Sequence, residues 1–204
     1  MAKNTECHGL TPGRPRRAAP TTKSGFTTVE LAMVVGMTLI LSTLATFGLQ
    51  SFLRAYRAGA DARAIASQLS LARMRASSAF TRAQLFVNAN AQTYQVRLDS
   101  NKDGTFDAND VTEGGTYSLS PGVNLGFGAI TTPAGEQTTI SQSVDAASPV
   151  FNSRGVPGNG TLTPYAIYLT NSDGDLFYAV TVSQSGRVNV WQWQTTPTPS
   201  WAAR

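Results

Sequence analysis

The sequence predicts an α+β fold in which a long N-terminal transmembrane and stalk helix packs on a small antiparallel β-sandwich head. Three observations predict it: residues 31–53 contain no charged side chain, apolar residues at helical spacing continue to about residue 80, and alternation with period two follows. Of the 204 residues, 41% are hydrophobic and 14% are charged. This composition is too apolar for a disordered chain and sufficient for a packed core.

The basic residues are concentrated at the N-terminus. The whole chain has a net charge of +4 and a pI of about 9.5, which alone would suggest nucleic acid or anionic lipid as a partner. Five of the 16 basic residues but only one of the 12 acidic residues precede Phe26, so the remainder is neutral. The only cysteine and the only histidine are Cys7 and His8. Without these first residues the chain has no disulfide, cysteine nucleophile or Ser-His-Asp triad, and we expect no enzyme.

Residues 31–53 predict a membrane-spanning helix. About 23 residues at a rise of 1.5 Å cross a hydrocarbon core of roughly 30 Å. The basic flank before them predicts a cytoplasmic N-terminus and an exported C-terminal part. Glu30 lies at the start of this run, where a carboxylate costs a few kcal/mol unless it is paired. Cleavage after Gly25 would create an α-amino group on Phe26 that pairs with Glu30 of a neighbouring subunit.

The string SGFTTVELAMVVGMTLILSTLATF, residues 24–47, resembles the N-terminus of type IV pilins and type II secretion pseudopilins. The resemblance implies that a prepilin peptidase cleaves after Gly25 and methylates the Phe26 amine, and that Glu30 directs assembly. It also implies four parts: a leader (1–25), a transmembrane half-helix (26–53), an amphipathic stalk (54–82) and an exported β-rich head (83–204). The implied partners are that peptidase, other pilin or pseudopilin subunits and the inner-membrane assembly platform. The implied location is the inner membrane, single-pass with a periplasmic head, and then the fibre.

Two other interpretations of the apolar segment stay open. One is an uncleaved signal anchor with Glu30 at the interface. The other is a secretory signal cleaved at Thr43-Leu44-Ala45. The stalk argues against the second, because a stripe at helical spacing continues without proline and predicts one helix from about Thr27 to about Thr81. The stripe comprises Ala62, Ile65, Ala66, Leu69, Ala72, Ala76 and Phe80.

Basic residues flank this stripe. The stalk carries Arg54, Arg57, Arg63, Arg73, Arg75 and Arg82 against the single acid Asp61. We expect these arginines to meet anionic lipid headgroups or acidic surfaces of adjacent subunits.

Short alternating segments predict the strands of the head. They are residues 83–88, 93–99, 116–120, 123–130, 148–153, 164–171, 176–183 and 187–194. Trp191 and Trp193 share one face of the last segment, which we assign to the core. We expect the tail, residues 196–204, to be frayed. Within this region, residues 66–80, 148–160 and 184–190 resemble the H-type minor pseudopilins and related minor pilins.

The string DSNKDGTFDAND, residues 99–110, predicts a Ca²⁺ loop inserted in a hairpin. Its oxygen ligands fall at the spacing of an EF-hand-type loop: Asp99, Asn101, Asp103, Thr105 through its carbonyl, Asp107 and Asp110. Gly104 allows the sharp turn, and only Lys102 opposes the local negative charge. Asp110 replaces the usual glutamate and is shorter, so we expect a Kd near roughly 10⁻⁴ M. The alternative is a long polar turn without metal.

The function that these features predict is structural: a minor pilin or pseudopilin that assembles into a fibre. One alternative is a DNA-binding minor pilin. Some relatives bind DNA through a G-R-x-R hairpin, but here Asn189 replaces the second arginine after Arg187, and the head has 5 basic and 9 acidic residues. DNA is for these reasons not a favoured partner. The other alternative is a membrane-anchored, calcium-dependent glycan-binding module.

Overall fold

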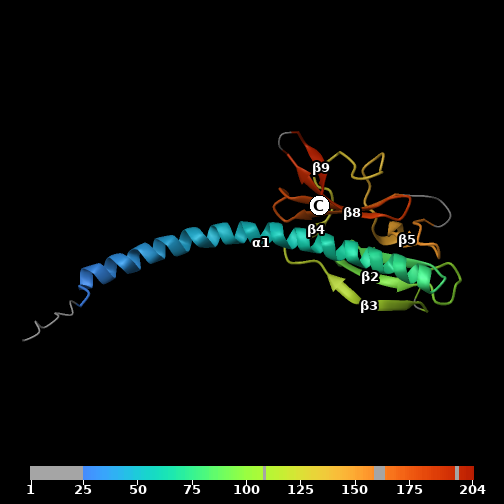
Figure 1. Ribbon diagram of the computed structural model, residues 1–204, viewed down its shortest axis with the longest axis horizontal. Helices are drawn as coiled ribbons and strands as arrows, with labels where there is room; N and C mark the ends of the chain where they lie inside the picture. The colour runs from blue at the N-terminus through green and yellow to red at the C-terminus, as the bar shows by residue number, and fades with distance from the viewer. Residues whose placement is uncertain (1–24, 108, 159–163, 196–197) are drawn as a thin grey trace, which may run out of the picture. The chain divides into compact units, whose positions relative to one another are not determined.

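The computed structural model describes residues 25–107, 109–158, 164–195 and 198–204, so the predicted leader lies outside the described residues except for Gly25. Helix α1 spans Thr28–Ser78 and is followed by two antiparallel sheets (Figure 1). The chain forms two compact units, which divide within α1 between Leu44 and Ala45. The predicted α+β class and the single long helix are confirmed.

Sheet A has the order β3-β2-β1-β5, and sheet B has the order β4-β6-β7-β8-β9. The strands of sheet A are β1 (Ala83–Asn88), β2 (Thr93–Leu98), β3 (Val111–Ser118) and β5 (Val150–Phe151). Those of sheet B are β4 (Val123–Leu125), β6 (Tyr165–Asn171), β7 (Phe177–Val182), β8 (Val188–Gln194) and β9 (Ser200–Ala203). A 3₁₀ turn, η1 (Asp145–Ala147), precedes β5.

The start of α1 is a capped helix terminus. The Thr27 hydroxyl accepts a hydrogen bond from the Glu30 backbone N–H at 3.2 Å, and the Thr27 carbonyl accepts from Leu31 at 3.0 Å. The spacing Thr-x-x-Glu is that of a capping box, and the negative charge of Glu30 also suits the positive end of the helix dipole. The sequence therefore gives Glu30 a local role in addition to the role expected in assembly.

The N-terminal half of α1 is long and apolar enough to cross a membrane, as judged by length and composition. Its large side chains are exposed, as Leu31, Met37 and Leu41 illustrate. Its hydroxyl groups bond to carbonyls one turn back: Thr38 Oγ1 donates to Val35 at 2.8 Å and Ser42 Oγ to Thr38 at 2.7 Å. The hydroxyls are thus satisfied within the helix, as an apolar environment requires.

The C-terminal half of α1 supplies one wall of the main core. Its fully buried residues are Ala58, Ala62, Ile65, Leu69, Ala72 and Ala76, and they pack in one cluster with side chains of both sheets. Small residues let the sheets approach closely: a Cβ added at Gly59 would lie 3.3 Å from Tyr178 Oη. The predicted stripe is confirmed except at Phe80, which lies beyond the helix end, has φ 51° and is 79% exposed. The prediction failed there because the helix stops at Ser78.

A second cluster covers the opposite face of sheet B. Alternation along β6 places Ile167 in the main core and Tyr168 in this second cluster, where Trp191 and Trp201 pack against it. The indole N–H of Trp191 donates to Thr181 Oγ1 at 2.8 Å. Trp191 and Trp193 are both half-buried: Trp191 packs against the second cluster, and Trp193 contacts the Trp201 ring with centroids 5.2 Å apart.

The described end of the tail forms a strand, so the prediction of a frayed C-terminus was wrong there. Residues 200–203 form β9, which pairs with β8 so that Trp193 lies opposite Trp201. The Trp201 indole N–H also donates to the Thr132 carbonyl at 2.9 Å.

Several stalk arginines contact the chain's own head, and contact of the stalk arginines with lipid headgroups or other subunits stays a prediction. Arg54 forms an ion pair with Asp173, and Arg75 Nη2 lies 3.1 Å from Glu113 Oε2. Arg73 Nη1 donates to the Gly186 carbonyl at 2.9 Å. Asp61, the only acidic residue of the stalk, also contacts the head. It is buried and accepts hydrogen bonds from the backbone N–H (2.8 Å) and the hydroxyl (2.9 Å) of Ser120. These contacts fix the C-terminal half of α1 against both sheets.

Replacing Leu69 tests the main core. We expect Leu69→Ala to lower the free energy of unfolding by about 2–5 kcal/mol, because it removes a fully buried side chain and leaves a cavity. Met74 lies on the same helix and is 63% exposed, so Met74→Ala should change stability by no more than about 0.5 kcal/mol. Urea unfolding of the full chain in detergent, followed by tryptophan fluorescence, measures both. Equal effects of the two variants would contradict this packing.

The stability of the head should fall at high pH. Burial, with smaller contributions from Asp61 and Tyr117, raises the pKa of Tyr94 from 10.0 to about 12. The folded state therefore favours the neutral phenol, so the contribution of Tyr94 is complete below pH 10 and is lost as the pH rises from 10 to 12. We expect Tyr94→Phe to lose less stability over this interval in urea titrations. Part of the fall should remain, since burial also raises the pKa values of Tyr165 and Tyr168. Parallel curves for the variant and the unaltered chain would contradict the assignment.

Candidate functional site

The predicted processing site is accessible. Phe26 is 80% exposed, and nothing lies within 4 Å of a Cβ added at Gly25. The Gly25–Phe26 bond precedes α1, so it is not held in helical conformation. Glu30 is exposed in the first turn of the helix. The structure thus places the three N-terminal residues that the sequence singled out within one short, open segment.

The predicted calcium loop begins on a buried acid. Asp99 follows β2 directly and is only 1% exposed. Its carbonyl accepts from the Thr81 hydroxyl at 2.6 Å, and its Oδ2 accepts from the Gly104 N–H at 3.1 Å. Its Oδ1 is buried and has no hydrogen-bond partner among the described residues. A buried carboxylate oxygen without a donor is costly, by about 1–3 kcal/mol or more, so this atom is the position in the loop that most requires a further ligand.

The other predicted ligands bond within the loop. Asp103 Oδ1 accepts from the backbone N–H of Thr105 at 2.8 Å and from its hydroxyl at 2.7 Å. Asn101 Nδ2 donates to Asp103 Oδ2 at 2.7 Å. Asp110 accepts from Ser100 N at 3.1 Å through Oδ1 and from Asp107 N at 3.0 Å through Oδ2. Asp107 in turn accepts from the N–H of Asn109 at 2.8 Å.

This arrangement keeps the carboxylates apart. Within the described ranges, no group of three or more His, Cys, Asp or Glu side chains is placed to hold a metal ion, and Ala108 of the loop lies outside these ranges. The turn geometry agrees with the sequence, because Gly104 has φ 85° in the left-handed region. The hydrogen bonds of Thr105 hold the pKa of the exposed Asp103 carboxyl below its usual value, with a smaller effect from Arg82. Asp103 is therefore ionised over a wider pH range than a free aspartate.

Arg82 is the functional residue that sequence reasoning missed at this loop. Its Nη1 donates to the Gly104 carbonyl, and its guanidinium lies over the Phe106 ring at 5.3 Å from the centroid. Its Nε is buried with no partner among the described residues. Lys102 is thus not the sole cation that opposes the acidic residues. The predicted β1–β2 hairpin could have indicated this position. Because Ala83 pairs with Leu98, Arg82 lies opposite Asp99 at the base of the loop.

Arg187 lies at the turn between β7 and β8 and is exposed. Its backbone N–H donates to the Ser183 hydroxyl at 3.0 Å, which closes the turn. Gly186 has φ 82°, and a Cβ there would lie 2.5 Å from the Gly155 carbonyl, so the turn requires glycine. Asn189 pairs with Thr181 inside the sheet. The Gly-Arg-Val-Asn string is therefore accounted for as a tight hairpin turn that packs on a second turn.

The chain is similar to solved structures of one protein. Two structures of the minor pseudopilin EpsH from the type II secretion system of Vibrio cholerae match it. The first is 13% identical over 66% of this chain and 95% of that chain, with a TM-score of 0.46. The second is 12% identical over 67% and 96%, with a TM-score of 0.47. No family model and no curated protein matches.

Proposed function

We propose that this chain is a structural subunit, a minor pilin or pseudopilin, of a type IV pilus or a type II secretion pseudopilus. It is processed after Gly25 and assembles through α1. The observation that carries the proposal is the order of features at the N-terminus. An accessible Gly25–Phe26 bond precedes the helix, an acid occupies its first turn, and an exposed charge-free run follows. An exposed apolar helix of this length needs a membrane or other helices around it.

The proposal gives the chain a sequence of locations and partners. It is inserted in the inner membrane with a cytoplasmic N-terminus and a periplasmic head, and it then enters the fibre. A prepilin peptidase, the assembly platform and other subunits act on it in turn. No catalytic role is part of the proposal. DNA binding is not proposed in its place, since Arg187 is one exposed cation on a head with 5 basic and 9 acidic residues.

Glu30 has a different task before and after assembly under this proposal. In the single chain it lies in the first turn of α1, where its charge suits the helix dipole. Among packed apolar helices, a lone carboxylate loses its water and needs a cation. The Phe26 amine that cleavage creates supplies this cation, and methylation leaves it able to carry a proton. Pairing of Glu30 with the amine of a neighbouring subunit would set the axial register of the fibre.

The N-terminal proposal is tested in cells that express the chain with its assembly machinery. Mass spectrometry of the sheared fibre fraction should find Phe26, methylated, as the first residue. Glu30→Gln keeps a side chain that suits the capping box but removes the charge. We therefore expect normal cleavage and at least a tenfold loss from the fibre.

Thr27→Ala is the matched control for this variant. It removes the hydroxyl that caps α1 and leaves Glu30 in place, at a cost of about 1 kcal/mol. We expect incorporation close to that of the unaltered chain. A mature chain that begins at Thr46, an uncleaved leader in the fibre, or normal incorporation of Glu30→Gln would contradict the proposal.

We also propose that the loop of residues 99–110 binds Ca²⁺. The unpartnered, buried Oδ1 of Asp99 supports a cation at this end of the loop, and the lowered pKa of Asp103 supports a second ionised ligand. Asn101, Asp107, Asp110 and the Thr105 carbonyl would complete the set. A bound divalent cation would offset repulsion among the acidic residues and hold the β2–β3 connection in one conformation. The Arg82 guanidinium at the Gly104 carbonyl is a fixed charge that would weaken this affinity.

Calcium should stabilise the head. With a Kd near roughly 10⁻⁴ M, about 10 mM calcium should add about 2.7 kcal/mol to the free energy of unfolding. Thermal unfolding of the full chain in detergent, with CaCl₂ or with EDTA, measures the effect. Asp103→Asn should remove most of it without disturbing the core, because Asp103 is exposed. Glu136→Gln replaces an acid outside the loop and should retain it. The same midpoint in CaCl₂ and EDTA would refute the calcium site.

A further inference from the structure

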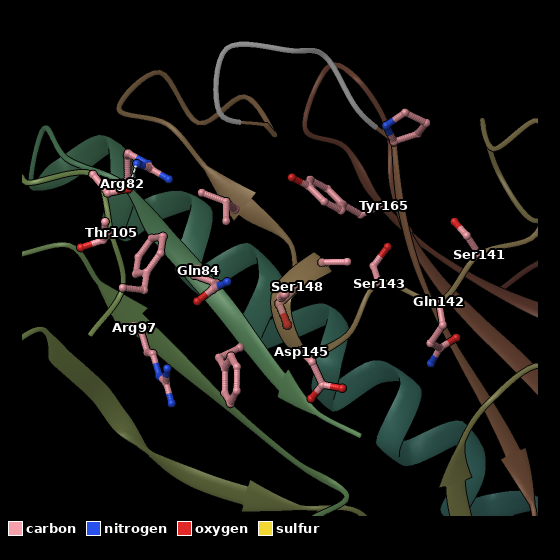
Figure 2. Close-up of a pocket in the computed structure, with 17 residues that line it drawn as sticks. Arg82, Gln84, Arg97, Thr105, Ser141, Gln142, Ser143, Asp145, Ser148 and Tyr165 are labelled. Carbon is pink, nitrogen blue, oxygen red and sulfur yellow. Dashed lines mark hydrogen bonds between the residues drawn. The ribbon is translucent and has the colours of Figure 1, made fainter. Parts of the chain in front are cut away.

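A cleft of 620 Å³ lies beside the acidic loop, and Gly104, Thr105 and Phe106 of that loop form part of its lining. Figure 2 shows its walls: Arg82, Gln84 and Arg97 lie on one side, and Ser143, Asp145 and Tyr165 lie on the other. The volume falls in the range of roughly 300–1,000 Å³ that ligand sites occupy. All of its lining residues belong to the second compact unit.

Two arginines of the cleft lie over aromatic rings, and neither forms an ion pair with a described carboxylate. The Arg97 guanidinium lies 3.9 Å from the centroid of Phe86, and Arg82 lies over Phe106. With the Gln95 amide turned to satisfy its neighbours, its oxygen accepts from Arg97 Nε and Nη2 at 2.7 and 2.6 Å. Over the described part of the chain, the ion pairs are Arg54–Asp173 and Arg75–Glu113, which involve neither arginine of the cleft. The Gln95 oxygen therefore holds the Nε–Nη2 edge of the Arg97 guanidinium, and the opposite edge is left for a ligand.

Polar groups on the floor of the cleft are also left without full hydrogen bonding. Gln84 is 7% exposed, and its side-chain amide bonds to no described residue. Ser143 Oγ accepts from Ala166 N and Ser148 Oγ accepts from Val87 N, each at 3.0 Å, but neither hydroxyl donates to a described group. None of these atoms is among the fully buried side-chain atoms that lack a partner in the described residues, so they are open to water in the free cleft and to a ligand that displaces it. The two serine hydroxyls and the Gln84 amide can thus donate hydrogen bonds to a ligand, and the Gln84 amide oxygen can accept one.

The chemistry of the walls selects among possible ligands. A sugar would stack on open aromatic faces, but guanidinium groups lie over Phe86 and Phe106. A peptide cannot pair with β1 as an added strand, because the backbone N–H groups of β1 that point away from β2 are already hydrogen-bonded. Leu85 donates to the Pro149 carbonyl, Val87 to Ser148 Oγ and Ala89 to Asp145 Oδ1. Recognition must therefore use side chains, and Asp145 is the single acid against two arginines in the lining.

We propose that this cleft binds a carboxylate-bearing peptide segment of a partner polypeptide. Arg97 meets the carboxylate with the far edge of its guanidinium, and Arg82 adds positive charge beside it. Gln84 and the two serine hydroxyls bond to the peptide groups of the segment. The inference does not depend on N-terminal processing. The cleft shares Gly104, Thr105 and Phe106 with the acidic loop, and Thr105 is a proposed calcium ligand, so binding is measured both with CaCl₂ and with EDTA.

The test uses the full chain in neutral detergent micelles and a fluorescein-labelled octapeptide of alternating Gly and Asp. Fluorescence anisotropy should give saturable binding, and the same peptide with Asn in place of Asp should not bind. Arg97→Gln should weaken binding at least tenfold. The control Arg187→Gln removes an equal charge from an exposed turn and should change the Kd less than twofold.

Gln84→Leu separates a built site from general charge attraction. It keeps both arginines and a similar side-chain volume but removes the polar floor, so we expect a threefold to tenfold weaker complex. Unchanged thermal midpoints of the variants in the absence of peptide would show that the head stays folded. No binding at millimolar peptide, equal losses in Arg97→Gln and Arg187→Gln, or unchanged binding in Gln84→Leu would overturn the proposal. So would displacement of the peptide by single-stranded DNA that depends on Arg187.

Discussion

Burial of one narrow face of α1 between two sheets is the constraint on which the head depends. Four of the six fully buried residues on this face are alanines, and Ile65 and Leu69 supply the larger side chains. Small residues let the helix approach both sheets at once, and Gly59 lets Tyr178 reach the helix backbone. Because one face contacts sheet A and sheet B together, the sheets enclose a single main core instead of forming two separate domains.

The polar contacts of α1 follow from the same geometry. The helix face outside the core carries arginines that reach the rims of the sheets, where Asp173, Glu113 and the Gly186 carbonyl meet them. Exposed ion pairs of this kind contribute little individually, typically below about 1 kcal/mol. Asp61 differs, because it is buried and accepts two hydrogen bonds from Ser120. Apolar packing therefore supplies most of the stabilisation, and these contacts fix the orientation of helix and sheets.

The acidic loop and the cleft are joined by one side chain. Arg82 directly precedes β1, donates to the loop at Gly104 and lines the cleft with Phe106. A cation in the loop and an anion in the cleft would both act on this guanidinium, with opposite sign. The proposed calcium and peptide sites are thereby neighbours that share a charge, while the N-terminal motif lies in the other compact unit.

Local patterns determined α1, most of the strands, the N-terminal motif and the left-handed turn at Gly104, because each depends on residues close together in the chain. Local patterns failed at Phe80, where the helix had ended, and at β9, whose pairing with β8 is formed by tertiary contacts of Trp193 and Trp201. The positions of the predicted loop ligands were readable, but the role of Arg82 required the β1–β2 register. The cleft lay wholly outside the reach of sequence, because Arg97, Gln84 and Tyr165 come from three strands. Only the packing of those strands brings these side chains together around one cleft.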